Sequence, residues 1–285
     1  MEIEGIWLPI ITPFLNNEVD FVSYEKLVEH YISKGISGLI PGATTGESPV
    51  LSDYELEKLL DITLAVSKGR VPVYAGLSGN YTDKVIKHLK LLEKYKIQGI
   101  LSASPYFNRP DQRGIYEHFR KIAESTSLNI IIYNIPYRTG RNIENKTIYK
   151  LAAIKNIVGI KDSCGDIRQT MELLLNRPDN FDILTGEDIL TYTTLTLGGD
   201  GAILASSHLF TDDFVKVYNL VKENNHKAAL QIWTKLAAFI PLLFEEPNPA
   251  PIKFYLTHKG MIQSPEVRLP LMEITDELKS RLNMV

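Results

Sequence analysis

The sequence contains a single cysteine, so no disulfide can form within the chain, and a reducing cytoplasm is the compartment we expect. No run approaches the roughly 18 apolar residues of a membrane span. The first residues, MEIEGIWLPIITPF, are acidic where a signal peptide needs basic residues. A net charge of -3 gives no basic footprint for nucleic acid or for an anionic membrane surface. These features predict a cytoplasmic protein with neither a nucleic-acid nor a membrane partner.

Signals for metals and bound nucleotides are also missing. The six histidines are scattered without metal-ligand spacing, and we expect them on surfaces or helix faces. No GxGxxG or P-loop pattern occurs, and the glycines of LGGDGAI are wrongly arranged for one. Cys164 has no histidine in an evident partner position, which favours a packing role. We therefore expect neither a metal nor a cofactor.

What the chain does contain is a regular alternation of short apolar runs with amphipathic segments. The runs are nearly continuous in apolar residues, as is typical of parallel strands covered on both faces. A chain of 285 residues is long enough for one large α/β domain. The runs are 5–12, 37–43, 71–77, 98–105, 129–136, 157–163, 181–187 and 201–207.

Helical patterns lie between these runs, with apolar residues at three-to-four spacing. Eight strand–helix units predict a (β/α)8 barrel, a TIM barrel, over residues 1–225. Residues 226–285 continue as helical pattern and predict a C-terminal helical domain. An open sheet of nine or ten strands is the alternative, which the even spacing disfavours.

One lysine stands out among the strand ends, where such a barrel carries its reactive groups. Lys161 follows the apolar run Ile157–Ile160 directly. Burial lowers the pKa of an amine, and a neutral lysine can form a Schiff base with a carbonyl substrate. The alternative is an ion pair with Asp162 or Glu187, and strand position alone leaves the two interpretations even.

The residues at the other strand ends are polar and mostly uncharged. Thr44 and Thr45, in a glycine-flanked turn, offer hydroxyl and N–H groups for a small carboxylate. Tyr133 could move a proton, although a tyrosine at a strand end more often only packs. Arg138 could hold a second carboxylate in bidentate fashion. This set favours the Schiff-base interpretation of Lys161.

Eight motifs in order carry a resemblance that spans essentially the whole chain. The chain resembles the dihydrodipicolinate synthase / N-acetylneuraminate lyase family of pyruvate-dependent class I aldolases. Together the motifs are highly specific, whereas any one alone would not be. They are PIITPF, GATTGES, SPYFNRP, YNIPYRTG, NIVGIKDS, LTGED, LGGDGAI and EEPNPAP.

The resemblance implies that pyruvate condenses with L-aspartate 4-semialdehyde, the step that leads to diaminopimelate and lysine. No cofactor is implied, because pyruvate forms a covalent imine with Lys161. By matching position, Tyr133 and Thr44 belong to a hydroxyl relay for protons, and Thr45 binds the pyruvate carboxylate. Arg138 would hold the carboxylate of the semialdehyde. The backbone at Gly186 and Ile203 would line the site.

Two departures from the family pattern concern a relay and an effector site. Synthases of the family usually carry a second tyrosine that reaches across a dimer interface, where this chain has Phe107, which lacks the hydroxyl. Members inhibited by L-lysine use histidines and a glutamate, at positions where this chain has Asp53, Leu56 and Lys84. The resemblance therefore implies a degenerate effector site that L-lysine does not occupy. Its residues would be Ser48, Asp53, Leu56, Asn80, Lys84 and Tyr106.

Two further functions stay open at this point. A lyase of the same family could cleave a sugar acid such as 2-keto-3-deoxygluconate or N-acetylneuraminate; Phe107 allows this and Arg138 speaks against it. A non-catalytic ketoacid-binding homologue has no need of Lys161, Tyr133 and Thr44 together. The resemblance also implies a homotetramer, as a dimer of dimers, or a homodimer.

Overall fold

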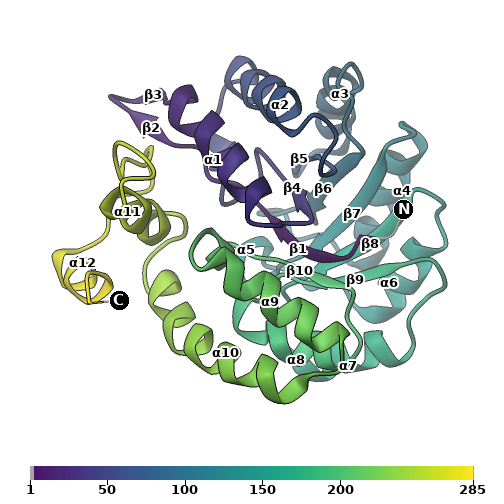
Figure 1. Ribbon diagram of the computed structural model, residues 1–285. Helices are drawn as coiled ribbons and strands as arrows, with labels where there is room; N and C mark the ends of the chain where they lie inside the picture. Colours follow the sequence, from purple (N-terminus) through teal and green to yellow (C-terminus); the bar gives the residue numbers. More distant parts are fainter. Residues whose placement is uncertain (1–2, 285) are drawn as a thin grey trace. The chain divides into compact units, whose positions relative to one another are not determined.

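The computed structural model describes residues 3–284 (Figure 1). These residues form two compact units. The first unit holds the chain up to Gly5 together with Tyr74–Ile203. The second unit holds Ile6–Val73 and the chain from Leu204 onward. All eight predicted strand positions contain a strand, each shorter than its apolar run.

Six parallel strands form the sheet of the first unit, in the order β10-β9-β8-β7-β6-β5. The residues of β6 are all buried, as expected for a strand covered on both faces. Successive helices pack against one another, α3 on α4, α4 on α6 and α6 on α7. The strands are β5 (Tyr74–Gly76), β6 (Gly99–Ala103), β7 (Asn129–Asn134), β8 (Ile157–Asp162), β9 (Asp182–Thr185) and β10 (Gly201–Ile203).

The helices of this unit follow the predicted segments, and several begin at a side-chain cap. Asp111 and Asp166 each accept a hydrogen bond from a backbone N–H of the first turn, which satisfies a donor the helix itself cannot pair. The helices are α3 (Thr82–Leu92), α4 (Gln112–Glu124), α5 (Pro136–Thr139), α6 (Asn145–Ala152), α7 (Ile167–Leu175), η2 (Asp188–Leu190) and α8 (Thr191–Thr196).

In the second unit, β1 (Gly5–Leu8) pairs in parallel with β4 (Gly38–Leu39). A side chain at Gly38 would overlap the ring of Trp7, so this close pairing requires glycine. A hairpin of β2 (Phe14–Leu15) and β3 (Glu18–Val19) was not predicted. Its turn residues Asn16 and Asn17 both have positive φ, 53° and 64°, as a two-residue hairpin turn requires.

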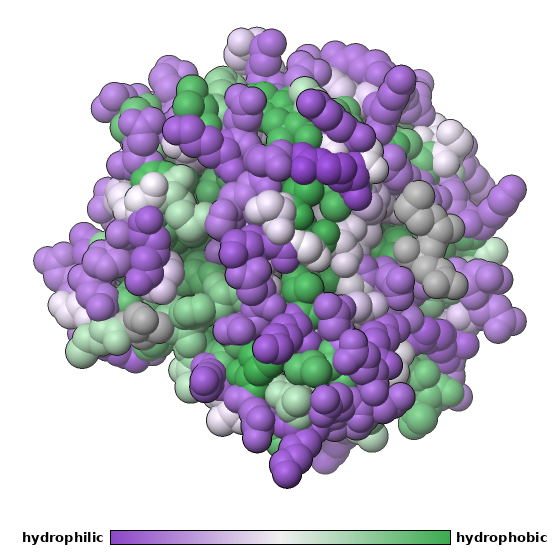
Figure 2. All heavy atoms as spheres, in the orientation of Figure 1, coloured by the Kyte–Doolittle hydropathy of each residue, from purple (hydrophilic) through white to green (hydrophobic). Residues whose placement is uncertain are grey.

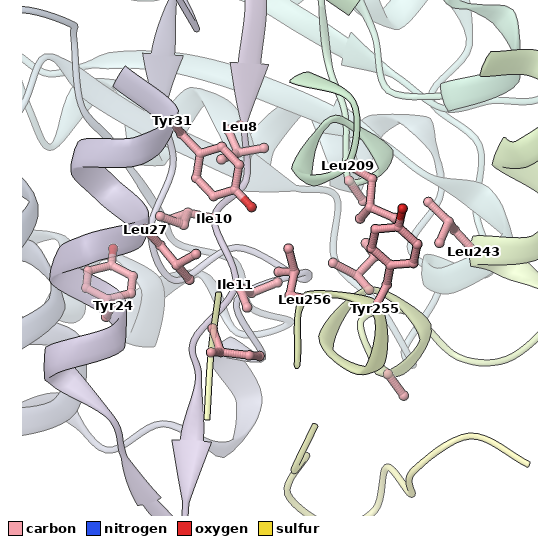
Figure 3. Close-up of a cluster of buried hydrophobic side chains, with 14 of the residues drawn as sticks. Leu8, Ile10, Ile11, Tyr24, Leu27, Tyr31, Leu209, Leu243, Tyr255 and Leu256 are labelled. Atoms are coloured by element: carbon pink, nitrogen blue, oxygen red, sulfur yellow. The ribbon is translucent and has the colours of Figure 1, made fainter. Parts of the chain in front are cut away.

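The second unit also contains the C-terminal helices. α1 packs on α2, α9 on α10 and α11 on α12. The buried aliphatic and aromatic side chains labelled in Figure 3 come from both ends of the chain and form one hydrophobic core. The helices are α1 (Phe21–Ser33), η1 (Ser48–Val50), α2 (Asp53–Ser67), η3 (Ser206–His208), α9 (Thr211–Lys222), α10 (His226–Phe239), η4 (Ile240–Phe244), α11 (Ala250–His258) and α12 (Asp276–Leu282).

His226–Phe244 is long and apolar enough to cross a membrane by length and composition alone, although polar residues interrupt it and it holds no continuous run of roughly 18 apolar residues. Core helices of soluble proteins meet the same criterion. Phe239 and Leu243 of this segment belong to the hydrophobic core of the second unit, and the Trp233 ring lies edge-on to that of Phe214. Hydrophilic side chains cover most of the face drawn in Figure 2.

Eight parallel strands that alternate with helices along the chain have the connectivity of the predicted (β/α)8 barrel. The helices α10 to α12 follow the last of these units, as the C-terminal pattern predicts. A division between two domains at residue 225 stays a prediction.

Candidate active site

Lys161 lies near the end of β8 and is 6% exposed. It is paired in register with Tyr133 of the neighbouring strand β7. Residues paired in this way point to the same face of a sheet. The Lys161 Nζ atom accordingly lies over the Tyr133 ring, 4.3 Å from its centroid. The strand pairing thus brings together the two residues that the sequence singles out for chemistry.

Burial lowers the pKa of Lys161 to about 8, because an ammonium group inside the protein loses its hydration. The negative charges of Asp188 and Glu187 oppose this shift, whereas the positive charge of Arg138 adds to it. At pH 7 about a tenth of the amine is neutral, roughly 300-fold more than for a lysine of pKa 10.5. A larger share of the Lys161 amine is therefore neutral near pH 7 than for an ordinary exposed lysine.

The alternative of an ion pair with Asp162 has no support in the geometry. The Asp162 Oδ2 atom accepts a hydrogen bond from the Thr170 hydroxyl at 2.6 Å, and Oδ1 accepts one from the Cys164 backbone N–H at 3.1 Å. Burial raises the pKa of Glu187, which weakens it as a counter-ion. The catalytic role of Lys161 stays a prediction, and the carboxylate with the largest charge effect on it is Asp188.

Tyr133 is buried, and its pKa is raised because burial disfavours the phenolate. The phenol therefore keeps its proton near neutral pH. A protonated phenol whose ring lies against the amine suits a group that donates a proton and then recovers it, which is how a relay works.

Gly186 follows β9 and donates its backbone N–H to the carbonyl of Asp162 at 2.7 Å. A Cβ at this position would overlap Lys161 Cε and Ser163 Oγ. Only glycine leaves room for the lysine side chain to extend past the end of β9. Ile203, at the end of β10, is fully buried in the same unit.

Arg138 lies in the short helix α5, which directly follows β7. Its side chain is exposed, and its Cζ atom lies 5.6 Å from the centroid of the Tyr137 ring. Gly140, at φ 73°, ends the helix in the left-handed conformation that glycine favours. The Arg138 side chain is also hydrogen-bonded to that of Tyr137, and its positive charge lowers the pKa of Lys161.

Thr44 and Thr45 lie in the second unit, on the loop that follows β4. Thr12 tethers this loop, because its hydroxyl donates to the Gly46 carbonyl at 2.8 Å. The Thr45 hydroxyl accepts a hydrogen bond from Asn248 Nδ2 at 3.1 Å. The side chains of Thr45 and Asn248 are both buried. The contact with Asn248 was not predicted.

A buried charge cluster on the same loop also escaped prediction. The carboxylate of Glu47 forms an ion pair with Lys253 of α11, and both side chains are essentially inaccessible. The other oxygen of Glu47 accepts from the Arg268 backbone N–H at 3.2 Å. Lys253 Nζ and Arg268 Cζ lie 4.0 Å and 4.3 Å from the centroid of the Phe14 ring. The cluster fixes the loop that carries Thr44 and Thr45.

The residues of the two family departures lie on the surface or at its edge. Phe107 is 89% exposed and has φ 68°, a conformation that a bulky residue rarely adopts. The positions of the degenerate effector site fall in both units. Asn80, Lys84 and Tyr106 belong to the first unit, and Ser48, Asp53 and Leu56 to the second.

The histidines were expected on surfaces or helix faces; His118 of α4 and His208 of η3 are buried, so these two lie on inward-facing helix positions and not on the surface. Burial lowers the pKa of each to about 4, so both are neutral at pH 7. His208 Nε2 accepts from the Ile11 backbone N–H at 3.0 Å. Among residues 3–284 no group of three or more His, Cys, Asp or Glu side chains could hold a metal ion.

Known proteins resemble the chain over its full length. The model of the dihydrodipicolinate synthetase family matches residues 2–285. A relative from Clostridium acetobutylicum named 4-hydroxy-tetrahydrodipicolinate synthase 2 is 59% identical and covers 99% of each chain. The crystal structure of dihydrodipicolinate synthase from Thermotoga maritima has a TM-score of 0.97 at 36% identity, over 100% of this chain and 97% of that one.

A second solved structure comes from Acinetobacter baumannii and is described as dihydrodipicolinate synthase complexed with pyruvate. It has a TM-score of 0.96 at 33% identity and covers 99% of this chain and 97% of that one. These likenesses confirm the predicted (β/α)8 barrel with C-terminal helices and exclude the open-sheet alternative.

Proposed function

The chain belongs to the dihydrodipicolinate synthetase family, and from this premise we propose how its residues carry the family's reaction. The activity is that of a 4-hydroxy-tetrahydrodipicolinate synthase, a lyase of the lysine and diaminopimelate pathway. The substrates are pyruvate and L-aspartate 4-semialdehyde. The observation that carries the proposal is the buried Lys161 amine, of pKa about 8, over the Tyr133 ring.

The reaction begins when the neutral Lys161 Nζ attacks the keto carbon of pyruvate. Water leaves, and an imine joins the lysine to the former keto carbon. Loss of a proton from the pyruvate methyl group then gives an enamine. The enamine carbon bonds to the aldehyde carbon of the semialdehyde, and the product's own amine displaces Lys161 from the imine. No metal or organic cofactor enters this sequence.

Protons must arrive and leave at each of these steps. The buried, protonated Tyr133 supports a role as the donor to the departing hydroxyl of the carbinolamine. Thr44 would pass the proton onward, and Thr45 would donate to the pyruvate carboxylate. The backbone at Gly186 and Ile203 would line the pyruvate end of the site. The compartment we propose is the cytoplasm.

A coupled assay tests this function directly. Initial rates are measured with pyruvate and L-aspartate 4-semialdehyde, beside cleavage of 2-keto-3-deoxygluconate and of N-acetylneuraminate. We expect turnover only in the condensation. Cleavage of a sugar acid at a higher kcat/KM than the condensation would contradict the proposal, as would activity with neither class.

Arg138 gives the first prediction about the second substrate. If Arg138 holds the semialdehyde carboxylate, Arg138→Ala should raise the apparent KM for the semialdehyde far more than that for pyruvate. One charge-assisted hydrogen bond is worth about 1.5–3 kcal/mol, and the exposure of Arg138 places the effect toward the lower end. Arg141→Ala, at an exposed position just after α5, is the matched control. Equal changes for both substrates would refute the assignment.

Phe107 gives a second prediction. Phe107→Tyr should raise kcat, because it restores a hydroxyl where other family members have one. A positioned proton-transfer group is worth roughly 10²–10⁴-fold, and the gain should be smaller because water replaces it in part. Tyr106→Phe, at the neighbouring position, is the control. An unchanged or lower kcat would mean that the relay never uses this position.

The same residue supports an assembly of several copies. Phe107 is 89% exposed, at the position where other family members carry a tyrosine that reaches across a dimer interface. We propose a homodimer, or a homotetramer built from two dimers, in which Phe107 lies at the dimer interface. Sedimentation equilibrium on wild type and Phe107→Asp distinguishes these states from a monomer.

The third prediction is that L-lysine does not inhibit the enzyme at submillimolar concentration. Lys84 presents a positive charge where sensitive relatives have a carboxylate, and it is exposed. Repulsion of the ligand's ammonium should weaken binding by about tenfold or more even after screening. L-lysine is titrated against initial rate for wild type and Lys84→Glu. Submillimolar inhibition of the wild type would show that Asp53 takes over as the acidic group.

A further inference from the structure

The Thr45 hydroxyl has one hydrogen to donate, and its neighbour decides where that hydrogen points. Asn248 Nδ2 donates to Thr45 Oγ1 at 3.1 Å, so the oxygen already accepts a hydrogen bond. The single hydroxyl hydrogen is then left for another acceptor. A neighbour that accepted instead would draw that hydrogen to itself.

The contact is specific to this pair. Asn248 is 8% exposed, and its donation to Thr45 is the one side-chain hydrogen bond it makes within residues 3–284. Its Oδ1 atom is buried without a partner in that range. A buried amide oxygen left unpaired has a cost, so the bond to Thr45 is the hydrogen bond that holds this amide.

The turn that carries Asn248 is held in place on both sides of the contact. Ala250 donates its backbone N–H to the Pro247 carbonyl at 3.0 Å, and Lys253 donates to that of Pro249 at 2.9 Å. The Lys253 side chain then forms the buried ion pair with Glu47, two residues beyond Thr45. The two segments are thus joined at two points, one of which sets the direction of the Thr45 hydroxyl.

We propose that Asn248 is a positioning residue of the pyruvate site, which turns the Thr45 hydroxyl hydrogen toward the substrate carboxylate. This inference rests on the proposed role of Thr45. Asn248 need not touch pyruvate. It acts by offering a donor, and never an acceptor, to the threonine that does.

Substitutions that change whether residue 248 donates or accepts a hydrogen bond test this proposal. Asn248→Asp keeps the shape but presents only acceptors, so the Thr45 hydroxyl should turn to it, and the apparent KM for pyruvate should rise roughly 10- to 100-fold. Asn248→Ala removes the donor to Thr45 without adding an acceptor for the hydroxyl hydrogen. It should raise the apparent KM for pyruvate by less than about tenfold. In both variants kcat should change less than KM. Asn219→Asp, exposed on α9, controls for the added charge.

Repeating the substitutions in a Thr45→Val background separates positioning from charge repulsion or general damage. Without the hydroxyl, neither Asn248→Ala nor Asn248→Asp should raise the KM for pyruvate further. If Asn248→Asp fails to fold, the comparison of Asn248→Ala with and without Thr45→Val still tests the positioning role. Melting temperatures accompany each measurement. Equal effects of Ala and Asp, or effects that persist in the Thr45→Val background, would overturn the inference.

Borohydride trapping of pyruvate on the wild-type enzyme distinguishes a failure of the proposed function from a failure of the role proposed for Asn248. If the wild type forms no adduct, the proposed Schiff-base function is wrong. If the adduct forms and the pattern of KM values does not appear, only the role of Asn248 is wrong.

Discussion

Replacement of Lys161 by alanine should abolish the covalent adduct that pyruvate and borohydride leave on the wild-type enzyme. Borohydride reduces an imine to a stable secondary amine, so the peptide that contains Lys161 should gain the mass of the reduced pyruvate. Without the amine no imine can form. Removal of a covalent nucleophile typically lowers kcat by roughly 10³-fold or more, and we expect a loss on that scale.

The pH dependence of trapping gives the same prediction a second readout. Only the neutral amine attacks pyruvate, so the trapping rate should rise as pH increases toward the pKa of about 8 and level off above it. Lys155→Ala is the matched control, because Lys155 is exposed just before the same strand. Labelling of any other lysine, or an adduct that survives in Lys161→Ala, would remove the basis of the mechanism.

Much of the fold could be predicted because its signals are local. Eight apolar runs matched the eight parallel strands, since a strand buried on both faces needs a continuous apolar sequence. The β2–β3 hairpin was missed although its signal was present. Asn16 and Asn17 are residues that tolerate positive φ, and they stand between Phe14–Leu15 and Glu18–Val19.

The reactive lysine could also be anticipated, because a charged residue that ends an apolar run is a local anomaly. What the sequence could not settle was its partner, since Asp162 is adjacent in the chain and Glu187 stands at the end of the next predicted strand. The structure excludes Asp162 as the ion-pair partner of Lys161, because its carboxylate accepts hydrogen bonds from Thr170 and Cys164. That choice depends on side-chain direction, which no spacing rule supplies.

Contacts between distant parts of the sequence were beyond prediction. Asn248 and Thr45 are 203 residues apart, and the ion pair of Glu47 with Lys253 spans a similar distance. The segment around Lys253, APIKFYLTHKG, shows an ordinary helical pattern, and a lysine in such a pattern is usually solvated. The one sequence feature that hints at a buried Lys253 is that it interrupts a run of apolar residues.

That buried lysine leads to the second large effect. Lys253→Met should destabilise the protein by about 3–5 kcal/mol, the cost of leaving a buried charge without its partner. Glu47 would lose its counter-ion while remaining inaccessible to water, and the Glu266 carbonyl would lose the Nζ donor that lies 2.9 Å away. Burial already raises the pKa of Glu47, so this carboxylate has little tolerance for a further loss of positive charge.

Urea unfolding of four variants tests the origin of this cost. Lys259→Met, at an exposed position just after the same helix, should change the free energy of unfolding only slightly. Glu47→Gln alone should also destabilise, because it leaves the ammonium of Lys253 buried. The double variant Glu47→Gln/Lys253→Met should be more stable than the sum of its single effects predicts, since neither buried charge remains. Additive effects, or a Lys253→Met effect no larger than that of Lys259→Met, would show that the pair contributes little. In that case the loop of Thr44 and Thr45 would depend on its remaining tethers, Thr12 to Gly46 and Asn248 to Thr45.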